Sequence, residues 1–140
     1  MKNERHSLPV LFPVAAAALV DGDGRVLVQQ RPFDKALPGL WEFPGGKLEP
    51  GESPEAALCR ELAEELAISV TESCLAPAVF ASVPLGDQHL LLLLFLCRKW
   101  QGIPRPVESP ALRWLRPLEL HAIEMPPADR PLIGLLEALL

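Results

Sequence analysis

The sequence has no excess of basic residues: 13 Lys and Arg stand against 18 Asp and Glu, giving a formal net charge of −5. Proteins that bind nucleic-acid polymers usually carry a basic patch or stripe. The charge balance therefore argues against a nucleic-acid polymer as the main partner. It does not argue against a single nucleotide, whose phosphates can be held through a divalent metal ion.

Cysteine and histidine are also scarce, with three residues of each type. The odd number of cysteines and their wide spacing fit neither a zinc site nor a disulfide framework, so we expect reduced thiols in a cytoplasmic protein. These are Cys59, Cys74 and Cys97. The histidines are equally scattered, and we interpret them as incidental: His6, His89 and His121.

The chain contains no low-complexity tract, no internal repeat and no apolar run long enough for a bilayer. Leu90 to Cys97 is far too short to cross a membrane, so we expect no membrane partner. The length of 140 residues, 49% of them apolar, suits one globular domain over residues 1–140.

The apolar run from Leu8 to Val20 follows Lys2 and Arg5 and could be taken for a signal peptide. Two prolines interrupt it, and no convincing cleavage site precedes Asp21. We favour a buried strand over 12–20, followed by an Asp-Gly turn over 21–24 and a second strand over 25–31. Two apolar runs joined by such a turn predict a β-hairpin.

The stretch 46–68 predicts a short helix that starts after a Pro/Gly-rich loop. Ser53 is a favoured N-cap, Pro54 suits the first helical position, and residues 55–66 are mostly good helix formers. At helical spacing the leucines form a stripe that can be buried: Leu58, Leu62 and Leu66. The neighbouring stripe carries only carboxylates: Glu61, Glu64 and Glu65.

This acidic stripe has two possible explanations. One is a solvated acidic face, as for most helical charge runs. The other is a metal site, because Glu61 lies three residues before Glu64 and four before Glu65, spacings that destabilise a helix unless a cation intervenes. Only Arg60 is nearby, and Glu52 adds a fourth carboxylate just before the helix. Oxygen ligands without Cys or His suit Mg²⁺ or Mn²⁺ and not zinc.

The same stretch resembles the Nudix hydrolase signature, in which a Gly is followed by a Glu and then by Arg-Glu-apolar-x-Glu-Glu-x-Gly-apolar. The matching residues are Gly46, Glu52, Arg60, Glu61, Leu62, Glu64, Glu65 and Ile68. Ala67 departs from the pattern, because the family has Gly there. If the family Gly ends the helix in a left-handed conformation, Ala67 should cost roughly 1 kcal/mol. The departure touches no carboxylate.

The resemblance extends to the MutT-like branch of the family on both sides of the signature. The Glu-Phe-Pro-Gly-Gly-Lys segment over 42–47 is common there, and the branch uses the carbonyl of the first Gly, here Gly45, as a metal ligand. Trp41 and Phe43 are better explained by core packing than by substrate stacking. The branch also carries a metal-binding Glu on a loop between two Trp residues, and Glu108 falls at that position between Trp100 and Trp114.

The rest of the chain predicts strands over 75–83, 89–97 and 112–116, with a turn over 84–87. A C-terminal helix should begin after Asp129 and turn its apolar residues to the core: Leu132, Ile133, Leu135, Leu136 and Leu139. Asp129 is a natural N-cap. It also follows a Pro-Pro-Ala segment like that of the MutT-like branch, whose 8-oxo-dGTP hydrolase has a base-reading Asn there. Asp129 and Gln88, which stands where that enzyme has Arg, leave base specificity open.

The resemblance implies the Nudix fold, an α/β fold with a mixed β-sheet sandwiched between helices. It also implies metal-dependent hydrolysis of a nucleoside triphosphate, such as the modified nucleotide 8-oxo-dGTP, to a monophosphate and pyrophosphate. The implied metal ligands for Mg²⁺, with Mn²⁺ as a substitute, are Gly45, Glu61, Glu64, Glu65 and Glu108. The implied catalytic residues are Glu61 as general base oriented by Arg60, with Glu108 as the second choice for the base.

Further roles are expected around this centre. Glu52 is expected to support the metal ligands without binding the metal itself. The candidate substrate-binding residues are Arg31, Gly46, Lys47 and Asp129. Lys47 is equally well explained as a solvated surface residue. The state of assembly is expected to be a monomer or a homodimer.

Two alternatives differ in substrate or class. The first is a Nudix hydrolase of another nucleoside diphosphate-linked substrate, such as CTP or 5-methyl-dCTP, a dinucleoside polyphosphate or a nucleotide sugar. The absence of Tyr weakens the dinucleoside option, because those relatives often stack a base on Tyr. The second alternative is a non-catalytic nucleotide-binding module that retains the fold.

Overall fold

The computed structural model describes residues 10–140 and contains two β-sheets and two α-helices. Lys2 and Arg5, considered as the start of a signal peptide and rejected in favour of a strand, lie outside the described residues, as does His6. The larger sheet has the strand order β4-β1-β6-β5, with β1 (Val10–Leu19) parallel to β6 (Gln88–Cys97). The edge strands β4 (Gly45–Lys47) and β5 (Ala76–Leu85) run antiparallel to their neighbours. This sheet is therefore mixed, as predicted.

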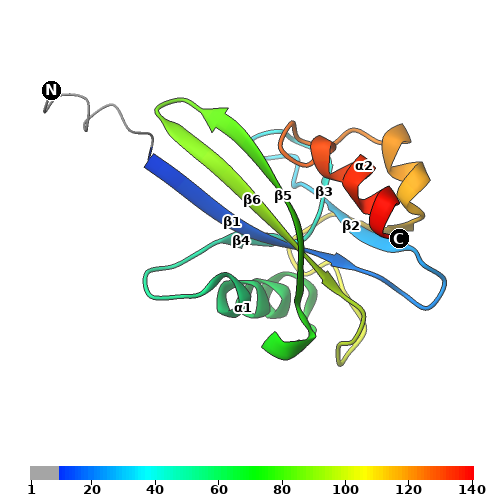
Figure 1. The fold of residues 1–140 in the computed structure, drawn as a ribbon. Coiled ribbons are helices and arrows are strands. Elements are labelled where there is room, and N and C mark those ends of the chain that lie inside the picture. The colour runs from blue at the N-terminus through cyan, green and yellow to red at the C-terminus, as the bar shows by residue number, and fades with distance from the viewer. Residues whose placement is uncertain (1–9) are drawn as a thin grey trace, which may run out of the picture.

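The two helices cover opposite faces of the mixed sheet (Figure 1). Along β1, Ala15, Ala17 and Leu19 pack with α1 (Pro54–Leu66), while Ala16 and Ala18 pack with α2 (Arg130–Leu139). Both sets are at most 2% exposed. Strand side chains alternate between faces, so the run of small residues lets each helix lie close to the sheet. The predicted α/β sandwich is confirmed.

A second, three-stranded sheet has the order β3-β2-β7, from β3 (Trp41–Glu42), β2 (Val26–Gln30) and β7 (Leu112–Leu115). The predicted hairpin between the first two long strands is therefore wrong. The turn forms, but β1 and β2 share only the isolated bridge between Val20 and Val26 and then join different sheets. One edge of β1 pairs with β6 along its whole length, and the other pairs with β4 over residues 14–16.

The predicted caps of α1 are confirmed. The Ser53 side chain accepts a hydrogen bond from the Ala56 N–H, and Leu58, Leu62 and Leu66 are fully buried. Ala67 ends the helix in the left-handed region, with φ 59° and ψ 35°. The helix end therefore keeps the geometry expected for Gly although Ala occupies it.

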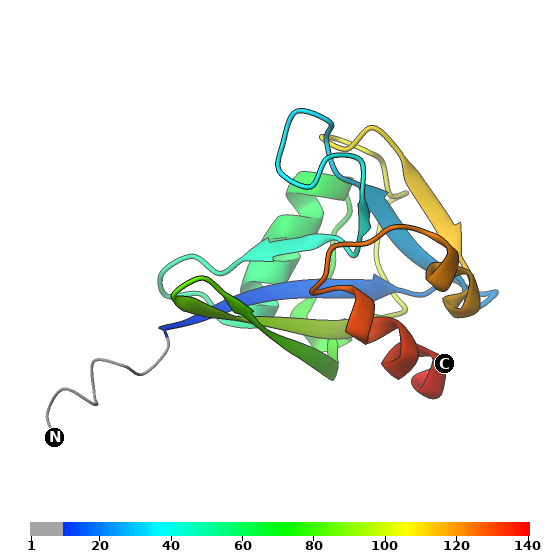
Figure 2. The ribbon, with the colours of Figure 1, turned by 90° about the horizontal axis from the view of Figure 1, so that it is seen from above.

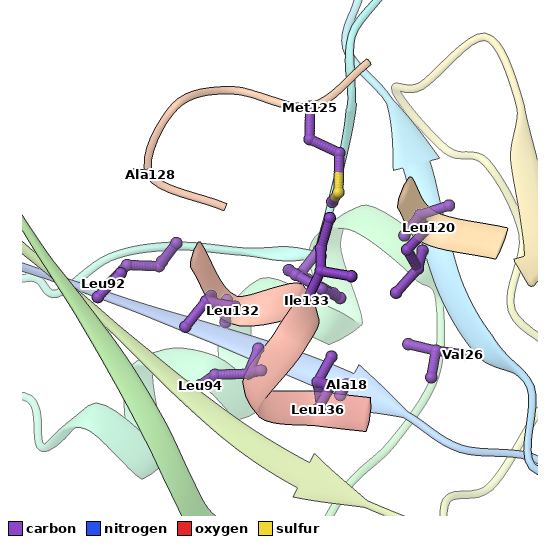
Figure 3. Close-up of a cluster of buried hydrophobic side chains, with 14 of the residues drawn as sticks. Ala18, Val26, Leu92, Leu94, Leu120, Met125, Ala128, Leu132, Ile133 and Leu136 are labelled. Carbon is purple, nitrogen blue, oxygen red and sulfur yellow. The ribbon is translucent and has the colours of Figure 1, made fainter. Parts of the chain in front are cut away.

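Helix α2 closes the opposite face of the mixed sheet (Figure 3). Leu132, Ile133 and Leu136 are buried against β1, β6 and the 3₁₀ helix Pro117–Ala122, which the sequence reading missed. Leu135 and Leu139 were expected in the core but are 42% and 50% exposed. The buried stripe is narrower than predicted because α2 contacts the core along one side only. No helix in residues 10–140 is long and apolar enough to span a membrane.

Candidate active site

A cleft of about 210 Å³ lies between the end of β2, the end of α1 and the loop that precedes β7. Its lining is almost entirely polar: Gln29, Gln30, Arg31, Pro32, Lys35, Glu42, Glu65, Glu108 and Ser109. In Figure 2 the loop after β2 (blue to cyan) and the loop before β7 (yellow) approach each other at the top of the view. The cleft thus brings together three of the predicted site residues, Arg31, Glu65 and Glu108.

The loop before β7 is held in place by the end of α1. The last carbonyls of a helix have no partner within the helix. Here Glu65 O accepts from Val107 N at 3.2 Å, and Leu66 O accepts from Arg105 N at 2.9 Å. Ser109 fixes the other end of the loop, since its hydroxyl donates to Gln30 O at 2.6 Å. These contacts place the exposed Glu108 in the same cleft as the helical Glu65.

Glu65 has a partly buried carboxyl group with a strongly shifted pKa. Its Oε1 accepts from Gly45 N at 3.0 Å and from Gln29 Nε2 at 3.1 Å. Burial, followed by the charge of Glu61, raises the pKa of Glu65 to about 8. The two hydrogen bonds oppose that shift without cancelling it. This setting therefore favours the neutral form of the Glu65 carboxyl group.

Glu61 lies beside the Gly45–Gly46 segment and outside the lining of the cleft. A Cβ on Gly46 would lie 1.8 Å from Glu61 Oε2, so only glycine allows this close approach. Burial raises the pKa of Glu61, and the neighbouring Arg60 guanidinium opposes the rise. Gly45 has a separate constraint, because a Cβ there would lie 2.1 Å from the Ala15 carbonyl oxygen.

Arg60 joins the carboxylates of the signature. Its Nε lies 2.8 Å from Glu52 Oε2, and its Nη1 lies 3.0 Å from Glu61 Oε1 and 3.5 Å from Glu64 Oε2. The hydrogen bond from Arg60 lowers the pKa of Glu52 to about 2. Glu52 therefore fixes the position of the Arg60 guanidinium. In this structure Arg60 is the cation that lies between the carboxylates of Glu52, Glu61 and Glu64. Among residues 10–140, no three acidic, histidine or cysteine side chains converge as a ready-made metal site.

Asp129 is buried, lies outside the lining of the cleft, and is not a side-chain N-cap. Only 7% of it is exposed, and its Oδ2 accepts from Phe43 N at 3.2 Å. The expected cap bond is absent from the start of α2, because the carboxylate turns to this distant backbone amide instead. Burial raises the pKa of Asp129 to about 7, with a further contribution from the charge of Glu42.

The other candidate binding residues divide between cleft and surface. Arg31 Nη1 lies 3.0 Å from Glu42 Oε1, and Arg31 Nε donates to Ala36 O at 2.8 Å, so this residue ties the following loop to β3. Lys47 is outside the cleft lining, and its ammonium group lies 5.1 Å from the centre of the Phe12 ring. Gln88, in the exposed start of β6, also lies outside that lining.

Sequence reasoning missed Gln29, Lys35, Glu42 and Ser109. Each of the first and third carried one weak signal. Gln29 is a polar residue at the end of an apolar strand, and Glu42 lies just before the Gly-Gly segment. Lys35 and Ser109 carried none, because loop closure brings them to the cleft.

Comparison with known proteins identifies the class. The NUDIX domain model matches residues 11–136. The 8-oxo-dGTP diphosphatase of Escherichia coli is 32% identical over 90% of this chain and 96% of its own length. The CTP pyrophosphohydrolase of the same organism is 37% identical over 88% of this chain and 90% of its own length. The solution structure of the E. coli ORF135 protein superposes with a TM-score of 0.83 at 35% identity, covering 94% of this chain and 91% of that one.

The chain therefore belongs to the Nudix family. More closely, it is a MutT-like Nudix hydrolase, an enzyme that acts on pyrophosphate bonds.

Proposed function

We propose that this enzyme hydrolyses a nucleoside triphosphate to the monophosphate and pyrophosphate with the help of Mg²⁺, for which Mn²⁺ can substitute. The observation that carries the proposal is the composition of the cleft. Three carboxylates line it together with the cationic Arg31 and Lys35: Glu42, Glu65 and Glu108. A polyphosphate bound through divalent ions needs carboxylates for the ions and cationic groups for the remaining phosphate charge.

The residues present fit a divalent metal ion in their chemistry. Nudix hydrolases generally use divalent metals, and the donors gathered here are oxygen atoms, which suit hard cations. Burial, with repulsion between neighbouring carboxylates as a smaller cause, raises the pKa values of Glu61 and Glu65, and a bound divalent ion would favour their charged forms. Glu61, Glu64, Glu65, Glu108 and the Gly45 carbonyl would hold the ions. The bound metal would neutralise phosphate charge and lower the pKa of the attacking water.

Glu61 is the proposed general base. Water attacks a phosphorus of the bridge between the α- and β-phosphates, its proton passes to a Glu61 carboxylate oxygen, and the bridging P–O bond breaks to give the monophosphate and pyrophosphate. Arg60 supports this role, because it contacts Glu61 at 3.0 Å while Glu52 anchors it at 2.8 Å. Glu108 is the second candidate base, since it is exposed on a loop and lines the cleft.

Base recognition involves Asp129 in this proposal. With a pKa of about 7, its carboxyl group can accept a hydrogen bond when ionised or donate one when protonated. An ionised Asp129 would accept from the N4 amino group of cytosine or from the N1–H and N2 amino edge of guanine. Two substrate classes follow, 8-oxo-dGTP and cytidine triphosphates. The similarity to both an 8-oxo-dGTP diphosphatase and a CTP pyrophosphohydrolase supports testing them together.

The test is a pyrophosphate-release screen of canonical, oxidised and methylated dNTPs and of CTP, with Mg²⁺ or Mn²⁺. We expect metal-dependent release from at least one of them. Glu61→Gln should lower kcat by about 10²- to 10⁴-fold, the range for a general base. Glu55→Gln, the same change in the first turn of α1, is the matched control and should retain the rate.

Two outcomes would contradict the proposal. Near-normal turnover by Glu61→Gln would rule out Glu61 as the base. Tight nucleotide binding by calorimetry without turnover under either metal would establish a non-catalytic binding module instead.

A further inference from the structure

Gln29 is a buried polar residue to which neither the signature nor the proposed reaction assigns a role. It lies in β2 and is 5% exposed, and it shares that degree of burial with only one other polar or charged residue in 10–140, Asp129. A buried amide must be hydrogen-bonded to offset its loss of hydration. Its Nε2 donates to Glu65 Oε1 at 3.1 Å. The contact links the second sheet to α1, across 36 positions of the sequence.

The same Glu65 oxygen receives a second hydrogen bond. Gly45 N donates to Oε1 at 3.0 Å, from the edge of the mixed sheet. No hydrogen bond within residues 10–140 uses the other oxygen, Oε2. Two donors on one oxygen fix the rotation of the carboxylate and leave Oε2 available to a ligand.

The two residues that follow Gln29 contact the other segments that line the cleft, the loop before β7 and strand β3. Gln30 O accepts from the Ser109 hydroxyl beside Glu108, and Arg31 contacts Glu42. The end of β2 therefore holds three separate segments in one arrangement. Among Gln29, Gln30 and Arg31, only Gln29 contacts a predicted metal ligand, Glu65, through its side chain.

The chemistry of a neutral amide suits this position. A carboxylate at residue 29 would repel Glu65, and a Lys or Arg would compete with a metal ion for the negative charge of Glu65. An apolar side chain would leave Oε1 with the Gly45 donor only. An amide orients the ligand without changing its charge.

We propose that Gln29 is a positioning residue that binds Oε1 of Glu65 and so presents Oε2 to the divalent ion. The inference rests on the proposed function, because it needs Glu65 to be a metal ligand. Loss of a residue that orients a metal ligand typically weakens metal binding 10- to 100-fold.

The experiment measures Mn²⁺ binding to the full chain by electron paramagnetic resonance, without nucleotide. Gln29→Met keeps the size of the side chain and removes the donor. We expect it to weaken Mn²⁺ binding about 10-fold. Gln101→Met, the same change at an exposed residue outside the cleft lining, should leave Mn²⁺ affinity within about 2-fold.

A double-mutant cycle separates positioning from general destabilisation. In a Glu65→Gln background, Gln29→Met should have almost no further effect on Mn²⁺ affinity. An equal loss in both backgrounds would overturn the inference, as would unchanged affinity in folded Gln29→Met. Absence of Mn²⁺ binding by the wild-type chain would instead overturn the proposed function, and the inference with it.

A measurement on the wild-type chain decides the question if Gln29→Met does not fold. The side-chain amide resonance of Gln29 should move when Mg²⁺ is added, whereas that of Gln101, in an exposed loop, should not. A Gln29 resonance that stays fixed at saturating Mg²⁺ would overturn the inference.

Discussion

Replacement of Ala67 by Gly should stabilise the protein. Ala67 has φ 59° and ψ 35°, a left-handed conformation that costs an L-residue about 1–2 kcal/mol. Gly removes that cost but gives the unfolded chain extra freedom worth about 0.4–1 kcal/mol. The net gain in the free energy of unfolding should be about 0.5–1 kcal/mol, or roughly 2–4 °C in Tm for a chain of this size. The Ala67 N–H bond to Ala63 O is a backbone contact and persists.

The matched control is Ala63→Gly, the same substitution in the same helix at an exposed position with ordinary helical geometry. It should destabilise the protein by about 0.5–1 kcal/mol. Urea unfolding of the three proteins measures both changes. If both substitutions lower stability, residue 67 does not adopt the left-handed conformation, and the account of the helix end is wrong.

Further predictions concern Asp129 and the two glycines before α1. Burial raises the pKa of Asp129 from its ordinary value of 3.8 to about 7 in the folded protein, so its contribution to stability is full below pH 4 and is lost as pH rises through 7. Relative to Asp129→Asn, the wild-type free energy of unfolding should fall by up to about 4 kcal/mol between pH 4 and 8; parallel stability curves for the two proteins would contradict this. Gly46→Ala should fold but displace Glu61, at a cost of about 100-fold in kcat. Gly45→Ala meets the Ala15 backbone and should lose about 1–3 kcal/mol by thermal unfolding; equal stability of the two Ala variants would refute this distinction.

Local features of the fold could be predicted from the sequence, because their causes lie within a few residues. Ser53 caps the helix that it precedes, and the leucine stripe of α1 is buried as its spacing indicated. The Asp-Gly turn also forms where predicted, yet β1 and β2 do not pair beyond one bridge. A turn sequence specifies local backbone geometry, whereas the partners of a strand depend on which edges other segments occupy.

The candidate site also contains residues that a local sequence pattern predicts and residues that only the fold brings together. The signature residues around α1 could be found from their spacing, and the structure adds the contacts of Arg60 with Glu52 and Glu61. The contacts of Gln29 and Asp129 span 36 and 86 positions, and no local pattern predicts them. The sequence predicts Asp129 as a helix cap, but its carboxylate instead accepts a hydrogen bond from the backbone N–H of Phe43, a buried donor that needs an acceptor.

The central claim is that carboxylates of α1 bind divalent ions that in turn hold a triphosphate. Its most direct test is a crystal structure with Mn²⁺ and a non-hydrolysable triphosphate analogue, with the ions located by anomalous scattering. We predict Mn²⁺ within about 2 Å of oxygens of Glu61, Glu65 and the Gly45 carbonyl, and also bonded to phosphate oxygens. Nucleotide bound elsewhere, or bound in the cleft with no ion at these oxygens, would contradict the account.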